Sequence, residues 1–454
     1  MGTIREGHQP PLIQDLKVTV HDTSVVLPAQ PTPRRSMFLS NIDQVLNFDV
    51  QTIHFFGPHP DHPPDAVVRK LRDALSQILV HYDFLAGRLV VDPAGSGRLV
   101  FDCNSAGIGF VVASSEYNLD DVGDLVYPNP AFEQLVTKVI CPDDKPLGIF
   151  QVTSFKCGGF AIGIQTNHST FDGLSFKMFL DNLSALAADK PLLFEPCNNR
   201  ELLAARSPPS VTFPHPELMK LDMLPCSGAD SSAPVFENTT EHLDFKIFRL
   251  TSEDIACLKR QAEDGGVKRA SGFNTVTALV WRCKALSAGQ GEAGDDERLS
   301  TLLYAVDIRS RLSPPLPQSY AGNAVLTAYA TASCKDLRAG PLSLLVEMVK
   351  EGSARMTDKY ARSAIDWGEL YKGFPNGEFL VSSWWRLGFA DVEYPWGRPR
   401  YSCPLVYHRK DIILLFPDID PALQNDNVNV LVALPPDEMA KFQSLFHKFL
   451  QESV

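Results

Sequence analysis

The chain has 454 residues, of which 44% are hydrophobic and 21% charged, so it has an ordinary globular composition and enough length for two or three domains. Its formal net charge of −12 argues against nucleic-acid binding, and an anionic ligand would need a local cluster of basic side chains. The nine cysteines include no Cys-x-x-Cys pair, so neither a disulfide framework nor a metal site is expected.

The amino-terminal residues 1–6 are polar and lack the apolar core of a secretion signal. No apolar run in the chain approaches the roughly 18 residues that a membrane helix needs. A cytoplasmic protein without membrane insertion is therefore expected.

The first part of the chain alternates strand and helix patterns. Residues 18–26 and 53–56 have the β-branched and aromatic composition of strands. Between residues 64 and 80 apolar side chains recur at helical spacing, which predicts a helix with one buried face. Strands over 149–153 and 160–165 follow, joined around two glycines.

The second of these strands leads into the segment 167–173, Asn-His-Ser-Thr-Phe-Asp-Gly, and a helix with a buried stripe follows it. His168 is thus predicted at a strand exit just before a helix. Catalytic side chains commonly occupy such loops, because a rigid scaffold positions them.

Residues 188–238 contain eight prolines among Ser, Asn and Asp, which predicts a long crossover linker. Similar mixtures of helices and strands stand on both sides of it. We therefore expect an amino-terminal lobe over 1–187 and a carboxyl-terminal lobe over 239–454. The second lobe is predicted to contain helices at 251–262, 275–286 and 342–356, strands at 301–306, 412–416 and 428–434, and a closing helix.

His168 and Asp172 form the pattern His-x-x-x-Asp. A neutral imidazole can accept a proton and return it near neutral pH. Asp172 could orient that imidazole or pair with an arginine elsewhere, and the spacing leaves both roles open. The pattern alone is weak, since about half of chains this long contain it by chance. Gly173 is expected to serve a tight turn.

Other catalytic motifs are absent from the sequence. There is no Gly-x-Ser-x-Gly, His-Glu-x-x-His or Walker A pattern. Residues 289–294 spell Gly-x-Gly-x-x-Gly, but they follow a helix and run into two aspartates. A dinucleotide site needs a strand before this motif and a helix after it, so we interpret the segment as a loop.

Seven blocks, in order along nearly the whole chain, resemble the plant BAHD family of acyl-CoA-dependent acyltransferases. They are the segments 27–33 with 39–43, Leu-Ala-Gly-Arg-Leu at 85–89, His-x-x-x-Asp-Gly at 168–173, 277–283, 307–317, 320–324, and Ser-Trp at 383–384. Seven ordered matches are far more specific than the His-x-x-x-Asp pattern by itself.

The family's second hallmark, Asp-Phe-Gly-Trp-Gly, is altered here. This chain reads Glu-Tyr-Pro-Trp-Gly from Glu393 to Gly397. Proline fixes φ near −65° and removes a backbone donor, so the loop must differ locally if the family's glycine uses a positive φ.

The resemblance implies an α/β fold of two chloramphenicol-acetyltransferase-like domains with a central solvent channel at their interface. It implies a ternary-complex reaction without an acyl-enzyme, in which His168 acts as general base. Acyl-CoA would be a co-substrate, with no bound cofactor and no metal. A monomeric enzyme of plant secondary metabolism is expected.

The resemblance also suggests roles for other residues. Asp172 would be a structural ion-pair partner of Arg309 or Arg311. Glu393 would likewise be structural, and Trp396, ahead of Gly397, either packs or donates its indole N–H to the oxyanion. Arg386 either lies at the surface or holds an acceptor carboxylate, as in relatives that acylate shikimate. Six basic residues are candidates for the CoA site: Lys246, Arg249, Lys259, Arg260, Lys268 and Arg282.

The sequence favours a hydroxycinnamoyl donor and an alcohol acceptor, such as an aliphatic ω-hydroxy acid, a fatty alcohol or a shikimate-like acid. Two alternatives stay open. One is a non-catalytic BAHD-like modifier of a lipid-elongation complex, which would tolerate the altered second motif. The other is a condensation-like enzyme that accepts acyl groups from a carrier protein, although Asn167 replaces the first histidine of that class's doubled pair.

Overall fold

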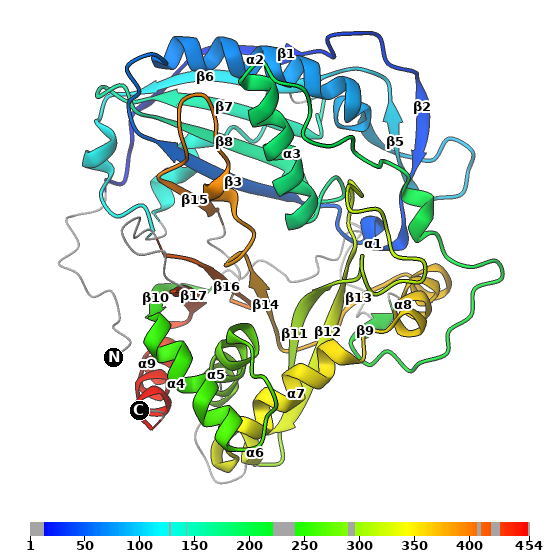
Figure 1. Cartoon of the computed structure of the whole chain (residues 1–454), viewed down its shortest axis with the longest axis vertical. Helices are drawn as coiled ribbons and strands as arrows, with labels where there is room; N and C mark the ends of the chain where they lie inside the picture. The colour runs from blue at the N-terminus through cyan, green and yellow to red at the C-terminus, as the bar shows by residue number, and fades with distance from the viewer. Residues whose placement is uncertain are drawn as a thin grey trace.

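A computed structural model describes residues 13–126, 129–141, 143–220, 241–288, 296–405, 410–418 and 427–452. Within these residues the chain forms two large sheets, each covered by helices, one above the other in Figure 1. The predicted two-lobed α/β architecture is therefore confirmed. The last part of the predicted linker, 221–238, and the Gly-x-Gly-x-x-Gly segment 289–294 lie outside the described residues.

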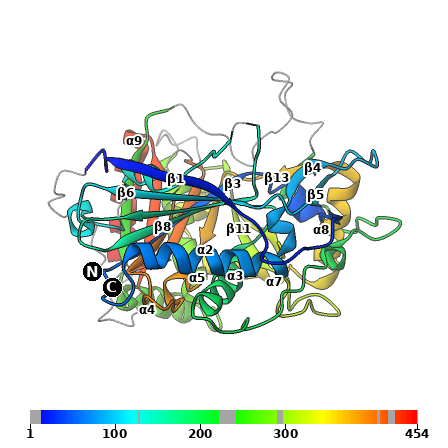
Figure 2. The ribbon, with the colours of Figure 1, turned by 90° about the horizontal axis from the view of Figure 1, so that it is seen from above.

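The first sheet has the strand order β1-β6-β7-β8-β3-β15 in the described part of the chain. Its strands are β1 (Val18–Val26), β3 (Asp49–Phe56), β6 (Ile108–Ser115), β7 (Gly148–Ser154), β8 (Phe160–Asn167) and β15 (Tyr401–Pro404). Helices α2 (Pro64–His81) and α3 (Gly173–Ala187) lie side by side over one face (Figure 1, Figure 2). Their apolar stripes bury against it, because residues three and four apart share a helix face.

The second sheet has the order β10-β17-β16-β14-β11-β12, again among the described residues. Its strands are β10 (Asp244–Leu250), β11 (Leu299–Asp307), β12 (Val325–Ser333), β14 (Phe379–Ser383), β16 (Ile412–Pro417) and β17 (Val428–Leu434). The helices that cover it are α4 (Ser252–Asp264), α5 (Gly272–Ser287), α6 (Cys334–Ala339), α7 (Leu342–Ala354) and α9 (Pro436–Gln451). Helix α5 is buried nearly all round, because it packs against α4, α6, α7 and α9.

Smaller elements lie outside the two large sheets. They are α1 (Asn41–Gln44), α8 (Asp358–Tyr371), the 3-10 helix η4 (Arg200–Leu203), and the strands β2 (Arg35–Phe38), β4 (Arg88–Val91), β5 (Leu99–Cys103), β9 (Leu218–Lys220) and β13 (Gly373–Pro375). Helix α1 packs against α8, and β9 of the crossover pairs with β13. The crossover therefore contains local structure of its own.

One strand crosses between the lobes. β15 lies in the carboxyl-terminal half of the sequence but pairs antiparallel with β3 of the first sheet, with Tyr401 opposite Phe55. The predicted domain boundaries at 187 and 239 remain a prediction. Among the described residues, no helix combines the length and the apolar character that a membrane span requires.

Candidate active site

His168 lies in the short loop between β8 and α3, with a backbone N–H that donates to the Phe48 carbonyl at 2.7 Å. Its ring lies 5.1 Å from the Phe48 ring, centroid to centroid. The imidazole lines a cavity of about 400 Å³, a volume that suits a small-molecule site. Walls of this cavity come from β3 and α1 of the first lobe and from α8, β12 and β14 of the second.

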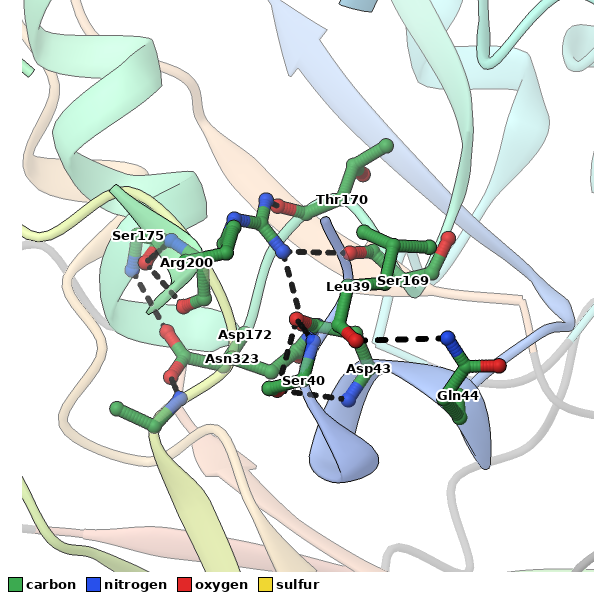
Figure 3. A network of polar contacts seen from close by, with 12 residues as sticks. Leu39, Ser40, Asp43, Gln44, Ser169, Thr170, Asp172, Ser175, Arg200 and Asn323 are labelled. Carbon is green, nitrogen blue, oxygen red and sulfur yellow. Dashed lines mark hydrogen bonds and ion pairs between the residues drawn. The ribbon is translucent and has the colours of Figure 1, made fainter. Parts of the chain in front are cut away.

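The carbonyl groups of three consecutive loop residues are each bound by a buried side chain from elsewhere in the chain. Asn323 Nδ2 donates to the His168 carbonyl at 2.9 Å. Arg200 donates to the carbonyls of Ser169 at 3.0 Å and Thr170 at 2.7 Å (Figure 3). Because a buried carbonyl without a partner is costly, these donors let the loop leave the sheet without exposing its backbone to water.

Asp43 connects these two donors. Its Oδ1 accepts from Arg200 at 2.8 Å and from Asn323 at 2.9 Å, while Oδ2 accepts from the backbone and hydroxyl of Ser40 at the start of α1 (Figure 3). The side chains of Arg200 and Asp43 are both fully buried. A charge this deep needs its partner, so the pair links α1, η4 and the His168 loop into one unit.

Asp172 points into a second buried network. Its carboxylate oxygens lie 3.0 and 2.8 Å from two nitrogens of Arg309. It also caps α3 by accepting from the Ser175 N–H at 2.9 Å, and it accepts from the Ala324 N–H at 2.9 Å. These donors occupy both oxygens, so Asp172 holds the two lobes together and makes no hydrogen bond to His168.

Arg311, the other arginine predicted as a partner of Asp172, instead donates to the Ser353 carbonyl in the last turn of α7. Arg309 meets Asp172, and it also contacts Asp307 at 2.9 Å. Spacing could not distinguish the two arginines, because both follow the same strand, β11.

Burial lowers the pKa of His168, and this effect outweighs the opposing influence of its own carbonyl, the Asp172 charge and Asn323. The imidazole is therefore neutral at pH 7, as a general base must be. Its Nδ1 is buried and has no hydrogen-bond partner among the residues that the structure describes. Asn323 Oδ1 is likewise buried and unpaired within the described part of the chain. Because His168 is only partly buried while Nδ1 is enclosed, we infer that Nε2 is the nitrogen open to the cavity.

Gly173 is the first residue of α3 and does not have a positive φ, so the expected tight turn does not explain why a glycine stands here. A Cβ at this position would lie 2.6 Å from Cδ1 of Leu387. A larger residue here would force the Leu387 side chain, from a loop of the second lobe, to move.

The second motif forms a turn. The Gly397 N–H donates to the Tyr394 carbonyl at 2.9 Å, which puts Pro395 at the second position, where its fixed φ is favoured and no donor is needed. Gly397 supplies the positive φ, at +97°. The altered residue is thus accommodated by the turn geometry.

Side chains of this motif do not line the cavity. Trp396 is buried, stacks on Tyr394 at 5.1 Å and contacts Phe56 and Phe160 edge-on. Glu393 is exposed and pairs with Arg398 at 2.6 Å.

Arg386 is exposed and lies over the Trp385 ring at 5.1 Å, outside the cavity. Among the basic CoA candidates, Arg249 pairs with Asp418, Lys246 bonds to Gln443, and Arg282 lies over Phe449. No cluster of three or more His, Cys, Asp or Glu in the described ranges is arranged to hold a metal ion.

Sequence reasoning assigned no role to Arg200, Asp43 or Asn323. Asp43 and Asn323 stand inside blocks that resemble the family, which was the available signal. Arg200 stands in the proline-rich crossover, where a charged residue has the appearance of a surface residue, so no pattern identified it.

Comparison with known proteins finds relatives over nearly the whole chain. A family model described as Transferase family matches residues 16–449. The chain is 61% identical to the acyltransferase GLAUCE of Arabidopsis thaliana over 99% of this chain and all of that protein. It is 33% identical to omega-hydroxypalmitate O-feruloyl transferase of Arabidopsis thaliana, over 95% of this chain and 93% of that protein.

Solved structures share the fold. Vinorine synthase is 26% identical and superposes with a TM-score of 0.72, covering 94% of this chain and 98% of its own. TRI101 of F. graminearum, solved with coenzyme A and deoxynivalenol, is 14% identical with a TM-score of 0.73 and covers 90% of this chain and 97% of its own.

Asp172→Ala should destabilise the protein by about 3–5 kcal/mol, because it removes one of the two carboxylates that pair with the buried Arg309 charge. Asp307→Ala is the matched control, since it removes a 36% exposed carboxylate from the same arginine and should cost less than about 1 kcal/mol. Urea denaturation would measure both. An Asp172→Ala protein with wild-type stability but no turnover would contradict the structural role.

Gly173→Ala should cost about 1–3 kcal/mol, since the new methyl group overlaps the Leu387 side chain. In a Leu387→Ala background the same substitution should cost little, because the space is then free. A double-mutant cycle from denaturation midpoints tests this, and equal costs in the two backgrounds would refute the steric explanation.

Proposed function

Because the chain belongs to the Transferase family of BAHD acyltransferases and is an acyltransferase, we propose that His168 is the general base for transfer of an acyl group from acyl-CoA to an alcohol. The observation that carries the proposal is the neutral, partly buried imidazole that lines a cavity between the lobes. Asp172, Glu393 and Trp396 do not line this cavity.

In the proposed reaction, Nε2 of His168 accepts the proton of the acceptor hydroxyl. The acceptor oxygen attacks the thioester carbonyl and forms a tetrahedral oxyanion. Collapse breaks the carbon–sulfur bond, and the imidazolium returns its proton to the CoA thiolate. Both substrates are bound together, so no acyl-enzyme forms. General-base assistance of this kind contributes about 10²–10⁴-fold to the rate.

A hydroxycinnamoyl donor is the finer proposal. Support comes from relatives whose names state feruloyl or caffeoyl transfer, at 33% and 31% identity. The cavity also has aromatic walls at Phe48, Trp367 and Trp384, which suit an aromatic acyl group. We propose an alcohol as the acceptor, and the exposed position of Arg386 gives no support to a carboxylate contact there.

Three basic residues are the proposed contacts for the CoA phosphates. Lys259, Arg260 and Lys268 lie in or just after α4 and have no ion-pair partner among the described residues. Arg249, by contrast, is committed to Asp418. Uncommitted cations of this kind can offset the net charge of −12 near an anionic donor.

His168→Ala should lower turnover by at least about 10²-fold, while His54→Gln, a change at a buried histidine outside the cavity, should retain it. Since the base must be neutral and burial lowers the pKa of His168, kcat/KM should fall only when the pH drops below 6.5. Release of free thiol across a pH series measures both. Unchanged turnover in His168→Ala would refute the mechanism.

With pooled alcohols as acceptors, p-coumaroyl-CoA should give a kcat/KM at least about tenfold above that of acetyl-CoA, because an aromatic acyl group buries more apolar surface in the cavity. A preference for acetyl-CoA would overturn the donor proposal. Acyl transfer only from a carrier protein would favour the condensation-like alternative. A folded protein that transfers from neither source would favour the non-catalytic modifier.

A further inference from the structure

Glu217 has a buried carboxyl oxygen that no group in the described part of the chain binds. Its side chain is almost completely buried and lines the same cavity as His168. Among the cavity-lining residues of the described ranges, only two side chains have a buried polar atom without a partner. These are His168, at Nδ1, and Glu217, at Oε2.

The other oxygen of Glu217 is fully engaged. Oε1 accepts from the Tyr360 hydroxyl at 2.7 Å and lies 3.0 Å from His215 Nδ1. Ser363 Oγ accepts from the backbone N–H groups of Thr212 and Phe213, so its own proton is available for His215 Nε2, 2.8 Å away. His215 then carries its proton on Nδ1 and donates it to Glu217. The network fixes the carboxylate and leaves Oε2 without a partner among the described residues.

The backbone at His215 adopts a conformation that such a residue rarely takes. His215 has a φ of +47°, although it is not glycine and precedes a proline, which normally requires an extended conformation. Such a conformation persists only where the surroundings impose it. His215 is buried here and both of its ring nitrogens are within hydrogen-bond distance of a partner.

An unpaired buried carboxylate oxygen costs about 1–3 kcal/mol or more, so in a native protein it requires an explanation. A group that fills the cavity and donates a hydrogen bond supplies one. A carboxylate oxygen is a hydrogen-bond acceptor, so the partner we look for is an O–H or N–H group.

We propose that Glu217 Oε2 is a substrate-binding subsite that accepts a hydrogen bond from a hydroxyl or amine remote from the reacting carbonyl. Two parts of the substrates can supply this donor. One is a ring hydroxyl on an aromatic acyl group, and the other is a second hydroxyl or an amine on the acceptor. The inference rests on acyl transfer in this cavity, as proposed above.

Glu217→Gln makes a sharp test. Because two donors already occupy Oε1, the amide oxygen of the new side chain should stay there, and its NH₂ group should take the place of Oε2. The subsite then changes from an acceptor into a donor. Glu133→Gln is the matched control, because Glu133 also lines the cavity but pairs with Lys138 at 2.8 Å.

The acyl arm measures binding alone. In a His168→Ala background, equilibrium dissociation constants are compared for p-coumaroyl-CoA and for 4-methoxycinnamoyl-CoA, which lacks the donor. The acceptor arm compares kcat/KM for a 1,ω-diol and for the primary alcohol of equal length. One arm should show a preference of about tenfold for the donor-bearing compound, lost in Glu217→Gln and kept in Glu133→Gln.

Equal values in both arms with the unmodified Glu217 would overturn the subsite, even if Glu217→Gln failed to fold. A preference that survives Glu217→Gln would overturn it too. Binding selectivity in the acyl arm without turnover by the active protein would refute the proposed function and leave the subsite supported.

Discussion

The loop that carries His168 must remain rigid where it leaves a sheet, in a place from which water is largely removed. Its carbonyl groups cannot rely on strand neighbours there, and side chains from distant parts of the chain replace them. Arg200 and Asn323 bind the carbonyls of residues 168–170, and Asp43 holds both of these donors. A buried guanidinium is a costly device, since the Arg200–Asp43 pair must recover the desolvation of both ions. Its benefit is geometric, because the planar fork fixes two carbonyls and a carboxylate at once.

The motif His-x-x-x-Asp therefore combines two separate tasks. His168 faces the cavity, while Asp172, one short loop away, caps α3 and pairs with Arg309 from the second sheet. The aspartate charge still reaches the imidazole through space and raises its pKa, but burial has the larger effect. The pKa of His168 is therefore set mainly by burial of the ring and not by a hydrogen bond to a carboxylate.

The sequence predicted those elements in which apolar residues recur at a regular helical or strand spacing. The regular apolar stripe predicted α2 within a residue, and the strand before His168 and the helix after it were also found. Helix α8 was missed for a physical reason. Its buried face carries apolar side chains such as Tyr360 and Ile365, but the buried polar residues Ser363 and Asp366, which bond to the crossover segment, interrupt the stripe. Arg200 escaped notice for the same reason, because long-range polar contacts leave no periodic pattern in the sequence.

The pairing of β15 with the sheet of the first lobe has a consequence for synthesis of the protein on the ribosome. The edge of β3 stays unpaired until residues 401–404 have emerged, and the partners of the His168 loop, Arg309 and Asn323 among them, also follow it by more than a hundred residues. An open strand edge invites pairing with other chains. The nascent amino-terminal lobe is therefore a natural client for chaperones, and the lobe produced alone would expose both that edge and an incompletely held catalytic loop.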